Sequence, residues 1–422
     1  MSDTIKPDNY ILNMAQSARE ASVALRAAGT LQKNRVLEKL ITLLNENREQ
    51  IKKENQRDLE EAKKMGLSEA MIDRLVLNDK GVDSIITSLQ EIIHLKDPVG
   101  EVISGGILPN GLHSVKVRVP IGVIAIIYES RPNVTIDVGA LGLKSSNAVI
   151  LRGGKEALYS NTILAKFFQK ALQAEGLPSN ALQLVENSDR SLLLELLKRN
   201  KEIDLIVPRG GEGLISFVSE HSLIPVVKHD KGVCHVYIDS DATKEIALAV
   251  TINSKVQRPG VCNAAETLLL DEKLLFSAEI LQHLQKNRVN LRADKETKDF
   301  FKDISFMDLT DEGYEKEYLS LDISVKVVKG LEGAIAHIER YSSGHSEAII
   351  SDNYSTVDKF LERVDSAALF VNASTRFHDG GQLGLGAEVG ISTGKLHCRG
   401  PMGLSDLTTT KYIVTGRGQI RT

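Results

Sequence analysis

The chain has 422 residues, of which 42% are hydrophobic and 26% charged, so it can bury a large core and should divide into two or three globular domains. Its 52 basic and 56 acidic residues give a formal net charge of -4, which excludes a global field that would favour nucleic acid or an anionic membrane surface. The wide separation of its three cysteines, the lack of a basic-then-apolar signal peptide and the lack of a long apolar run predict a cytoplasmic protein in a reducing compartment.

The N-terminal part of the chain, up to residue 98, has the pattern of amphipathic helices. Apolar residues recur there at helical spacing, and Glu, Lys, Asn and Arg fill the other face. The clearest run is Val36, Leu37, Leu40, Ile41 and Leu44. This section carries no chemical motif, so we expect it to serve as scaffold with a solvated charged face.

Residues 102–119 have the pattern of a β-hairpin. Apolar residues at 102–103 and 115–119 flank Asn110-Gly111, a pair typical of a tight reversal between strands. The second strand alternates apolar and basic residues. One face of this hairpin is therefore expected to be wet or to pair with another subunit.

From residue 120 onward, apolar strands alternate with helical segments. This alternation predicts a doubly wound parallel sheet, whose ligands bind at the carboxyl ends of the strands. The expected strands are 123–127, 149–151, 182–185 and 205–207, and the expected helices 156–174 and 190–199.

Two glycine pairs follow strands of this sheet and precede helices. They lie in the segments Arg152-Gly153-Gly154-Lys155 and Arg209-Gly210-Gly211. Glycines let backbone amides approach a phosphate, a helix N-terminus adds partial positive charge, and the basic side chains add full charges. Either segment alone could be a simple strand-to-helix turn, but two of them in one sheet favour a cofactor that carries phosphate.

A second α/β region follows residue 225, where the same alternation repeats. The expected strands are 232–238, 267–270, 325–328, 348–350 and 368–371, and the expected helices 242–254, 274–285, 331–341 and 356–364. The stretches 380–386 and 390–403 are rich in glycine and are predicted to be irregular, and 408–415 is predicted as a final strand.

Cys262 stands between the Pro259-Gly260 pair and an apolar strand. A turn of this kind fixes a side chain in position and leaves it reachable, which a nucleophilic thiolate requires. Cys234 and Cys398 each adjoin a histidine, but the close spacing typical of zinc modules is absent, so we expect no metal site.

Five segments, in this order along the chain, closely resemble the gamma-glutamyl phosphate reductase family, also called glutamate-5-semialdehyde dehydrogenases, within the aldehyde dehydrogenase superfamily. The resemblance covers nearly the whole chain, and its most specific parts are the Cys262 peptide and the loop Arg131-Pro132-Asn133. The five segments are 127–135, 152–155, 208–211, 257–267 and 396–404.

The resemblance implies an aldehyde dehydrogenase-like α/β fold with two doubly wound Rossmann-type domains and a small β element for oligomerisation. Residues 1–101 and 120–224 would form the NADP-binding domain and residues 225–385 the catalytic domain. Residues 102–119 and 386–422 would form the hairpin and C-terminal segment that bridge subunits of a homo-oligomer.

The implied activity is the NADPH-dependent reduction of L-glutamyl 5-phosphate to L-glutamate 5-semialdehyde with release of phosphate, a step of proline biosynthesis. Cys262 would form a thioester, and the oxyanion would be met by Asn133 and the Cys262 backbone N–H. A hydrolytic or coenzyme A-acylating relative, and a non-catalytic partner of glutamate kinase, remain the alternatives.

Departures from hydrolytic aldehyde dehydrogenases bear on the reaction. Their general-base glutamate has no counterpart in the segment 228–232, which favours transfer to phosphate over hydrolysis; His229 is either a base or a structural histidine. Positive charge at Lys155 favours NADP over NAD, unless Glu156 takes the place of the ribose-binding carboxylate. Glu317 resembles the superfamily glutamate that contacts the nicotinamide ribose.

Two arginines are candidates for the anionic groups of the substrate. Arg131 and Arg399 could each contact its α-carboxylate or its phosphate, or could form ordinary salt bridges. Physical association with glutamate kinase is also left open, as is the choice between dimer and tetramer.

Overall fold

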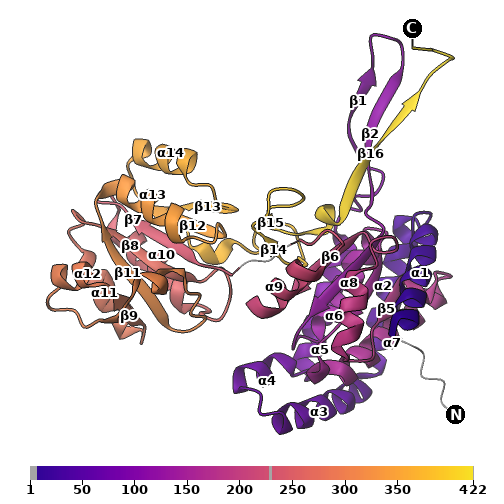
Figure 1. Ribbon diagram of the computed structural model, residues 1–422, viewed down its shortest axis with the longest axis horizontal. Coiled ribbons are helices and arrows are strands. Elements are labelled where there is room, and N and C mark those ends of the chain that lie inside the picture. The colour runs from indigo at the N-terminus through magenta and orange to yellow at the C-terminus, as the bar shows by residue number, and fades with distance from the viewer. Residues whose placement is uncertain (1–6, 228–230, 422) are drawn as a thin grey trace. The chain divides into compact units, whose positions relative to one another are not determined.

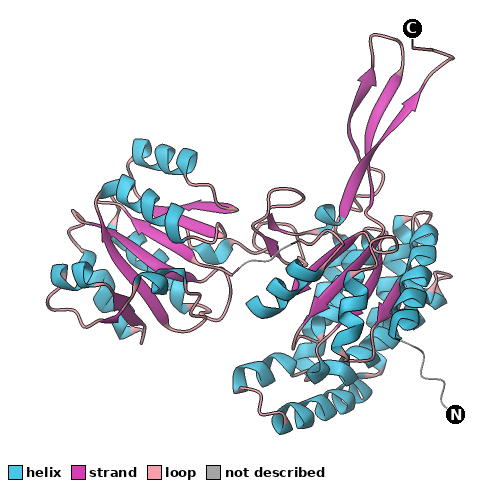
Figure 2. Cartoon of the chain, in the orientation of Figure 1, coloured by secondary structure: helices cyan, strands magenta, loops and turns pink. Residues whose placement is uncertain are grey.

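The computed structural model describes the whole chain except residues 1–6, 228–230 and 422. The chain divides into two compact units (Figure 1). Unit 1 contains Met1–His229, Leu385–Gly390 and Met402–Thr422, and unit 2 contains Asp230–Gly384 and Ile391–Pro401. Each unit has its own parallel sheet, with helices on its faces (Figure 2). The predicted α/β fold is confirmed.

Unit 1 begins with five helices, as the amphipathic pattern predicts. They are α1 (Pro7–Leu25), α2 (Thr30–Glu46), α3 (Arg48–Lys64), α4 (Glu69–Leu75) and α5 (Asp79–His94). The apolar stripe of α2, which includes Val36, Leu37 and Leu40, is fully buried. In the described ranges, no helix is both long and apolar enough to cross a membrane.

The parallel sheet of unit 1 has four strands in the order β5-β4-β3-β6. The strands are β3 (Val123–Tyr128), β4 (Ala148–Arg152), β5 (Leu182–Leu184) and β6 (Leu205–Arg209). The connecting helices are α6 (Asn133–Lys144), η1 (Lys155–Ala157), α7 (Leu158–Ala174), η2 (Ser179–Ala181), α8 (Arg190–Leu197) and α9 (Glu212–His221). The chain proceeds from β3 to β5 on one side and returns to β6 on the other side of β3. In doubly wound sheets, ligands usually bind at such a reversal, beyond the carboxyl ends of the strands, which here are those of β3 and β6.

A separate antiparallel sheet of unit 1 pairs the hairpin at residues 102–120 with a strand near the C-terminus. Its order is β1-β2-β16, and its strands are β1 (Val102–Ile107), β2 (His113–Pro120) and β16 (Thr408–Thr415). Figure 1 shows these strands extending away from the helices of unit 1. The reversal at residues 108–112 is longer than a two-residue turn, with Gly111 at φ 80°.

Unit 2 contains a seven-stranded parallel sheet in the order β10-β9-β11-β8-β7-β12-β13. Its strands are β7 (Cys234–Ile238), β8 (Ala265–Asp271), β9 (Asn290–Ala293), β10 (Met307–Asp308), β11 (Asp322–Val328), β12 (Ser346–Ile350) and β13 (Ala368–Val371). Its helices are α10 (Lys244–Val256), α11 (Ser277–Lys286), α12 (Lys295–Phe300), η3 (Asp311–Glu315), α13 (Gly330–Tyr341), α14 (Tyr354–Arg363) and η4 (Thr375–Phe377).

The central strands of unit 2 are buried on both faces. In β8, Leu268 and Leu270 belong to one hydrophobic cluster, and Leu269 belongs to a second cluster on the opposite face. Successive side chains of a strand point to opposite faces, so a strand covered on both sides carries a nearly continuous run of apolar residues, such as 268–270 in β8. This double burial explains the continuous apolar runs by which these strands were predicted.

Several short elements were not predicted. The strands β9 and β10 and the helix α12 lie in a polar stretch whose periodicity is weak. The glycine-rich stretch 390–403, predicted to be irregular, contains the paired strands β14 (Ile391–Ser392) and β15 (Gly400–Pro401), and η5 (Leu404–Leu407) follows it. Such elements depend on pairing with distant segments, which local pattern does not report.

Candidate active site

Cys262 lies in the turn that joins α10 to β8, here called the Cys262 turn (residues 257–264). Its side chain is partly exposed, whereas Cys234 and Cys398 are buried. The Ala264 N–H donates to the carbonyl oxygen of Val261 at 3.1 Å and closes the turn. Among the three thiols, Cys262 is therefore the one that a substrate can reach most readily.

Uncharged hydrogen-bond donors bind the backbone carbonyl groups of the Cys262 turn. The Cys234 thiol donates to the carbonyl oxygen of Cys262 at 3.1 Å, and the Thr375 hydroxyl donates to that of Asn263 at 2.7 Å. The Asn263 side-chain amide donates to the carbonyl oxygen of His378 at 3.0 Å. Burial raises the pKa of Cys234 well above its ordinary value, so this thiol keeps the proton that it donates. Sequence reasoning assigned Cys234 no such contact.

Gly232 packs directly against the same carbonyl group. A Cβ atom built on Gly232 would lie 1.7 Å from the Cys262 carbonyl oxygen, so no other residue fits without moving the backbone. Its N–H donates to Glu317 Oε1 at 3.0 Å. The structure thus brings Glu317 and Cys262, two predicted site residues, to opposite sides of one glycine.

A buried ion pair joins the two ends of the Cys262 turn. Lys255 Nζ in α10 lies 2.7 Å from Glu266 Oε2 in β8, and both side chains are fully buried. Glu266 also accepts a hydrogen bond from the N–H of Leu319 at 3.3 Å. Burial raises the pKa of Glu266 to about 7, against the opposing charge of Lys255. Removing either partner would leave an unpaired buried charge and destabilise the turn.

Asn133 is the first residue of α6 in unit 1, and its side chain is exposed. Its amide nitrogen donates to Asp137 Oδ2 at 3.0 Å, and Asp137 Oδ1 accepts from the Ser88 hydroxyl at 2.8 Å. Burial raises the pKa of Asp137, and the hydrogen bonds from Ser88 and Asn133 oppose that shift. The amide of Asn133 is oriented by this pair, and its second N–H is left for another acceptor.

The glycine pair after β6 lies between the carboxyl end of that strand and the first residue of α9. The N–H of Gly211 donates to Glu129 Oε2 at 3.0 Å, and the N–H of Glu129 donates to the carbonyl oxygen of Arg209 at 3.2 Å. A Cβ on Gly210 would lie 2.4 Å from the same carboxylate. A carboxylate of the chain itself therefore contacts the first amide before α9, which was predicted to face a phosphate.

The glycine pair after β4 is arranged in a similar way. Glu156 Oε1 accepts from the backbone N–H and the hydroxyl of Ser130, at 2.7 and 2.9 Å. Arg152 is partly buried and its guanidinium donates to the carbonyl oxygen of Ser188 at 3.3 Å, whereas Lys155 is exposed. If Glu156 were to bind the ribose of a cofactor, the ribose hydroxyls would compete with Ser130 for its carboxylate.

The two arginines predicted to contact the substrate lie in different units. Arg399, in unit 2, is bound to Asp365: its Nη1 lies 2.5 Å from Oδ1, and its Nη2 donates to the backbone carbonyl oxygen at 2.8 Å. Lys395 contacts the same carboxylate, and the hydrogen bonds from both cations lower the pKa of Asp365 to about 2. Arg131, in unit 1, is partly buried in the loop after β3.

The remaining site predictions concern a base and a metal. His229 lies outside the described residues, and no position is assigned to it. Among the residues that the structure describes, there is no cluster of His, Cys, Asp and Glu suited to a metal ion.

The fold and the Cys262 turn indicate a class of protein, and comparison with known families agrees. The sequence model of the aldehyde dehydrogenase family matches residues 8–299. The chain therefore belongs to the aldehyde dehydrogenase family, and more narrowly to its gamma-glutamyl phosphate reductases, as the following relatives show. The predicted family is thus confirmed.

The relatives match over their full length. Gamma-glutamyl phosphate reductase of Leptospira biflexa is 51% identical over 421 residues, which cover 99% of this chain and 100% of the relative. That of Aquifex aeolicus is 49% identical over 421 residues, covering 98% of this chain and 97% of the relative. The crystal structure of gamma-glutamyl phosphate reductase from Thermotoga maritima has a TM-score of 0.95 and 46% identity, covering 98% of this chain and 100% of that chain. The family implies a nicotinamide cofactor.

Proposed function

We propose that this chain reduces L-glutamyl 5-phosphate to L-glutamate 5-semialdehyde with NADPH and releases phosphate, a step in proline biosynthesis. The observation that carries the proposal is the full-length similarity to gamma-glutamyl phosphate reductases, in a chain that presents a partly exposed cysteine in the expected turn. The hydrolytic, coenzyme A-acylating and non-catalytic alternatives have no observation in their favour.

Cys262 is the nucleophile. Its thiolate adds to the acyl carbon of the substrate, the bond from carbon to the phosphate oxygen breaks, and inorganic phosphate leaves with the electron pair. The product of this step is a thioester on Cys262. A fixed backbone matters here because the sulfur must approach the acyl carbon along one direction, and the contacts from Cys234 and Gly232 hold the carbonyl group of this residue.

The bound nicotinamide cofactor supplies the hydride that reduces the thioester. Negative charge develops on the former carbonyl oxygen in both steps, and we assign its stabilisation to the backbone N–H of Cys262 and the side-chain amide of Asn133. Asp137 orients that amide. Loss of one such donor typically costs about 3–4 kcal/mol of transition-state stabilisation. When the C–S bond breaks, the aldehyde leaves and Cys262 returns as the thiolate.

We assign cofactor binding to residues 1–101 and 120–224, catalysis to 225–385, and subunit contacts to 102–119 with 386–422. The glycine pairs 153–154 and 210–211 and Arg209 would lie along the cofactor, and Glu317 near its nicotinamide ribose. The side chains of unit 1 fit a phosphate-bearing cofactor: Lys155 is exposed at the end of β4, and Arg152 lies beside it. This positive charge favours NADPH over NADH.

The three-stranded sheet β1-β2-β16 is the proposed subunit contact. It exposes large apolar side chains that a monomer would leave in water, among them Ile107 at 80%, Tyr412 at 68% and Val414 at 53%. A second copy of the chain would cover them.

The test runs the reaction in reverse with purified protein. We expect oxidation of glutamate semialdehyde by NADP only when phosphate is supplied, with formation of the acyl phosphate. Cys262→Ala should abolish turnover, and Cys398→Ala, at a buried thiol, is the matched control. Turnover without phosphate would indicate a hydrolytic enzyme, turnover that requires coenzyme A an acylating one, and full activity of Cys262→Ala would exclude the mechanism.

A further inference from the structure

Arg376 is bound to the Cys262 turn, although it is far from that turn in the sequence. It lies in η4, and its Nε donates to Gln257 Oε1 at 2.9 Å. The preceding residue, Thr375, donates through its hydroxyl to the carbonyl oxygen of Asn263, directly after Cys262. All of these residues belong to unit 2. Arg376 is therefore positioned by the same segment that holds the nucleophile.

In the described part of the chain, Arg376 has no carboxylate within ion-pair distance. Neither Arg376 nor the exposed Arg258 forms an ion pair with a carboxylate in the described part of the chain, whereas Arg292, Arg363 and Arg399 each do. Burial, and then the positive charge of Arg258, lower the pKa of Arg376, while the nearby Asp379 and Cys262 have the opposite effect. Two close guanidinium groups that lack a carboxylate partner are unfavourable until an anion binds.

The substrate of the proposed reaction supplies such an anion. Its α-carboxylate stays attached throughout the reaction, at the far end of a short chain from the carbon that Cys262 attacks. A guanidinium presents N–H donors in a planar fork that matches a carboxylate. We propose that Arg376 and Arg258 form the binding site for the α-carboxylate of the substrate beside Cys262. The identity of the ligand in this inference rests on the proposed function, whereas its negative charge follows from the two arginines alone.

The first experiment needs no enzyme activity. Cys262 is alkylated with iodoacetate, which carries a carboxylate, and with neutral iodoacetamide, and each rate is followed by mass spectrometry of the peptide. We expect Arg376→Gln to lower the ratio of the iodoacetate rate to the iodoacetamide rate about tenfold, and Arg258→Gln to lower it less, because Arg258 is more exposed. An unchanged ratio, or an equal fall in both rates, would overturn the proposal, since the arginines would then act only on the thiolate.

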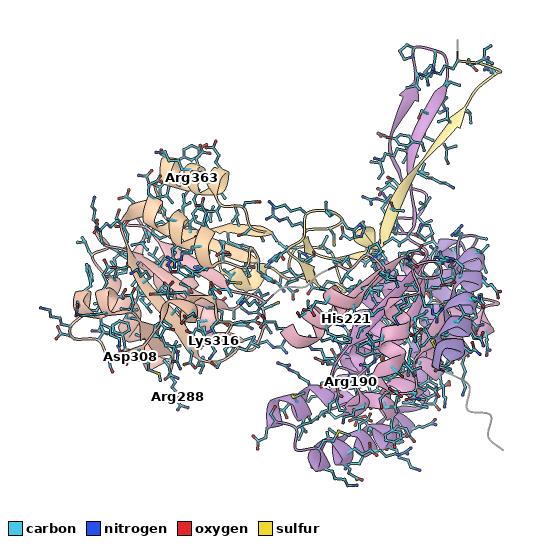
Figure 3. All side chains as sticks on the ribbon, in the orientation of Figure 1. Arg190, His221, Arg288, Asp308, Lys316 and Arg363 are labelled. Atoms are coloured by element: carbon cyan, nitrogen blue, oxygen red, sulfur yellow. The ribbon has the colours of Figure 1, made fainter. Side chains whose placement is uncertain are left out.

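The matched control is Arg363→Gln. Arg363 lies on α14 (Figure 3), is paired with Glu332 at 2.6 Å, and belongs to the same unit. The substitution removes one positive charge from unit 2 and leaves the contacts of the Cys262 turn unchanged. We expect Arg363→Gln to have the same ratio of iodoacetate to iodoacetamide rates as the unchanged protein. If the ratio fell as much as in Arg376→Gln, the effect would be due to net charge alone, and the proposed binding site would be refuted.

The second experiment identifies the anion. In the reverse reaction, Arg376→Gln should raise KM for glutamate semialdehyde about 100-fold, leave kcat within a few-fold and leave KM for phosphate unchanged, with partial rescue by Arg376→Lys. A rise in KM for phosphate alone would place the phosphate here and refute the carboxylate assignment. If the chain lacked the proposed activity, the alkylation ratio would still decide whether an anion site exists. Arg258→Gln, at an exposed position, keeps the test valid if Arg376→Gln fails to fold.

Discussion

Opposite kinds of group bind the backbone carbonyl groups of the Cys262 turn in unit 2 and the backbone amides of the loops after β3 and β6 in unit 1. Neutral donors, namely the Cys234 thiol and the Thr375 hydroxyl, bind the carbonyl oxygens of the turn. Carboxylates, namely Glu129 and Glu156, accept the backbone N–H groups of Gly211 and Ser130 in the loops of unit 1. The donors and the carboxylates both satisfy backbone hydrogen-bonding groups, but the donors add no charge to the turn, whereas the carboxylates add negative charge to the loops of unit 1.

This difference follows from what each region is expected to bind. A nucleophilic thiolate is more stable beside neutral donors and unpaired arginines than beside carboxylates. In unit 1, Glu129 accepts the hydrogen bond of an amide before α9, so the proposed attraction for a phosphate falls to exposed Lys155 and partly buried Arg152. The Cys262 turn is fixed by backbone packing, whereas the proposed cofactor binding depends on side-chain charge.

Among the variants that compare the two regions, the largest effect on kcat is expected at Gly232. In Gly232→Ala the new methyl group meets the Cys262 carbonyl oxygen, a backbone atom that cannot turn aside, so the nucleophile must shift. A displacement of this size can lower kcat about 100-fold. The measurement is kcat in the phosphate-dependent assay, together with the circular dichroism spectrum to confirm folding.

The matched glycine in unit 1 is Gly213, in α9. A Cβ there meets nothing within 4 Å, and the backbone is helical, so Gly213→Ala should keep full activity and raise the free energy of unfolding by about 0.4–1 kcal/mol. Equal losses of activity in both variants would contradict the contrast between the two regions.

A smaller effect is expected at Lys155. Lys155→Glu replaces the exposed positive charge after β4 by a negative one, so KM for NADP should rise about tenfold while KM for NAD changes little. The readout is the ratio of kcat/KM values for the two cofactors, measured at low and at high salt. A variant that kept the NADP preference of the unchanged protein would show that Lys155 does not contact the 2′-phosphate.

The last effect is on stability in acid and not on activity, and it concerns a buried histidine of unit 2, His337. Burial lowers the pKa of His337 from 6.5 to about 3, so the unfolded chain binds a proton that the folded chain rejects. This contribution to stability is complete above pH 6.5 and is lost as the pH falls toward 3. At pH 4, His337→Phe should recover about 3 kcal/mol of the loss.

The measurement for His337 is urea unfolding at pH 7 and at pH 4 of both proteins. His221→Phe, at an exposed histidine of α9, is the control and should show the pH dependence of the unchanged chain. A difference between His337→Phe and the unchanged protein that stayed constant with pH would reject proton uptake by His337 as the cause.

The sequence by itself determined the α/β class, the family and the position of Cys262 in a turn. The class and the turn follow from local sequence patterns, and the family follows from the motifs. Continuous apolar runs indicate strands that are covered on two faces, and Pro259-Gly260 before such a run indicates a turn. The weakly patterned strands β9 and β10 were missed because they exist only through pairing with distant segments.

Tertiary structure alone decided which side chains meet. Cys234 is 28 residues from the carbonyl group that it contacts, Glu129 is 82 residues from the amide that it accepts, and Arg376 is 119 residues from Gln257. No periodicity or spacing encodes such contacts, because they arise when parallel strands bring loops from remote parts of the chain to one edge of a sheet. The turn that carries Cys262 was therefore readable from the sequence, whereas the groups that hold this turn, and the arginines proposed to bind a substrate beside it, were not.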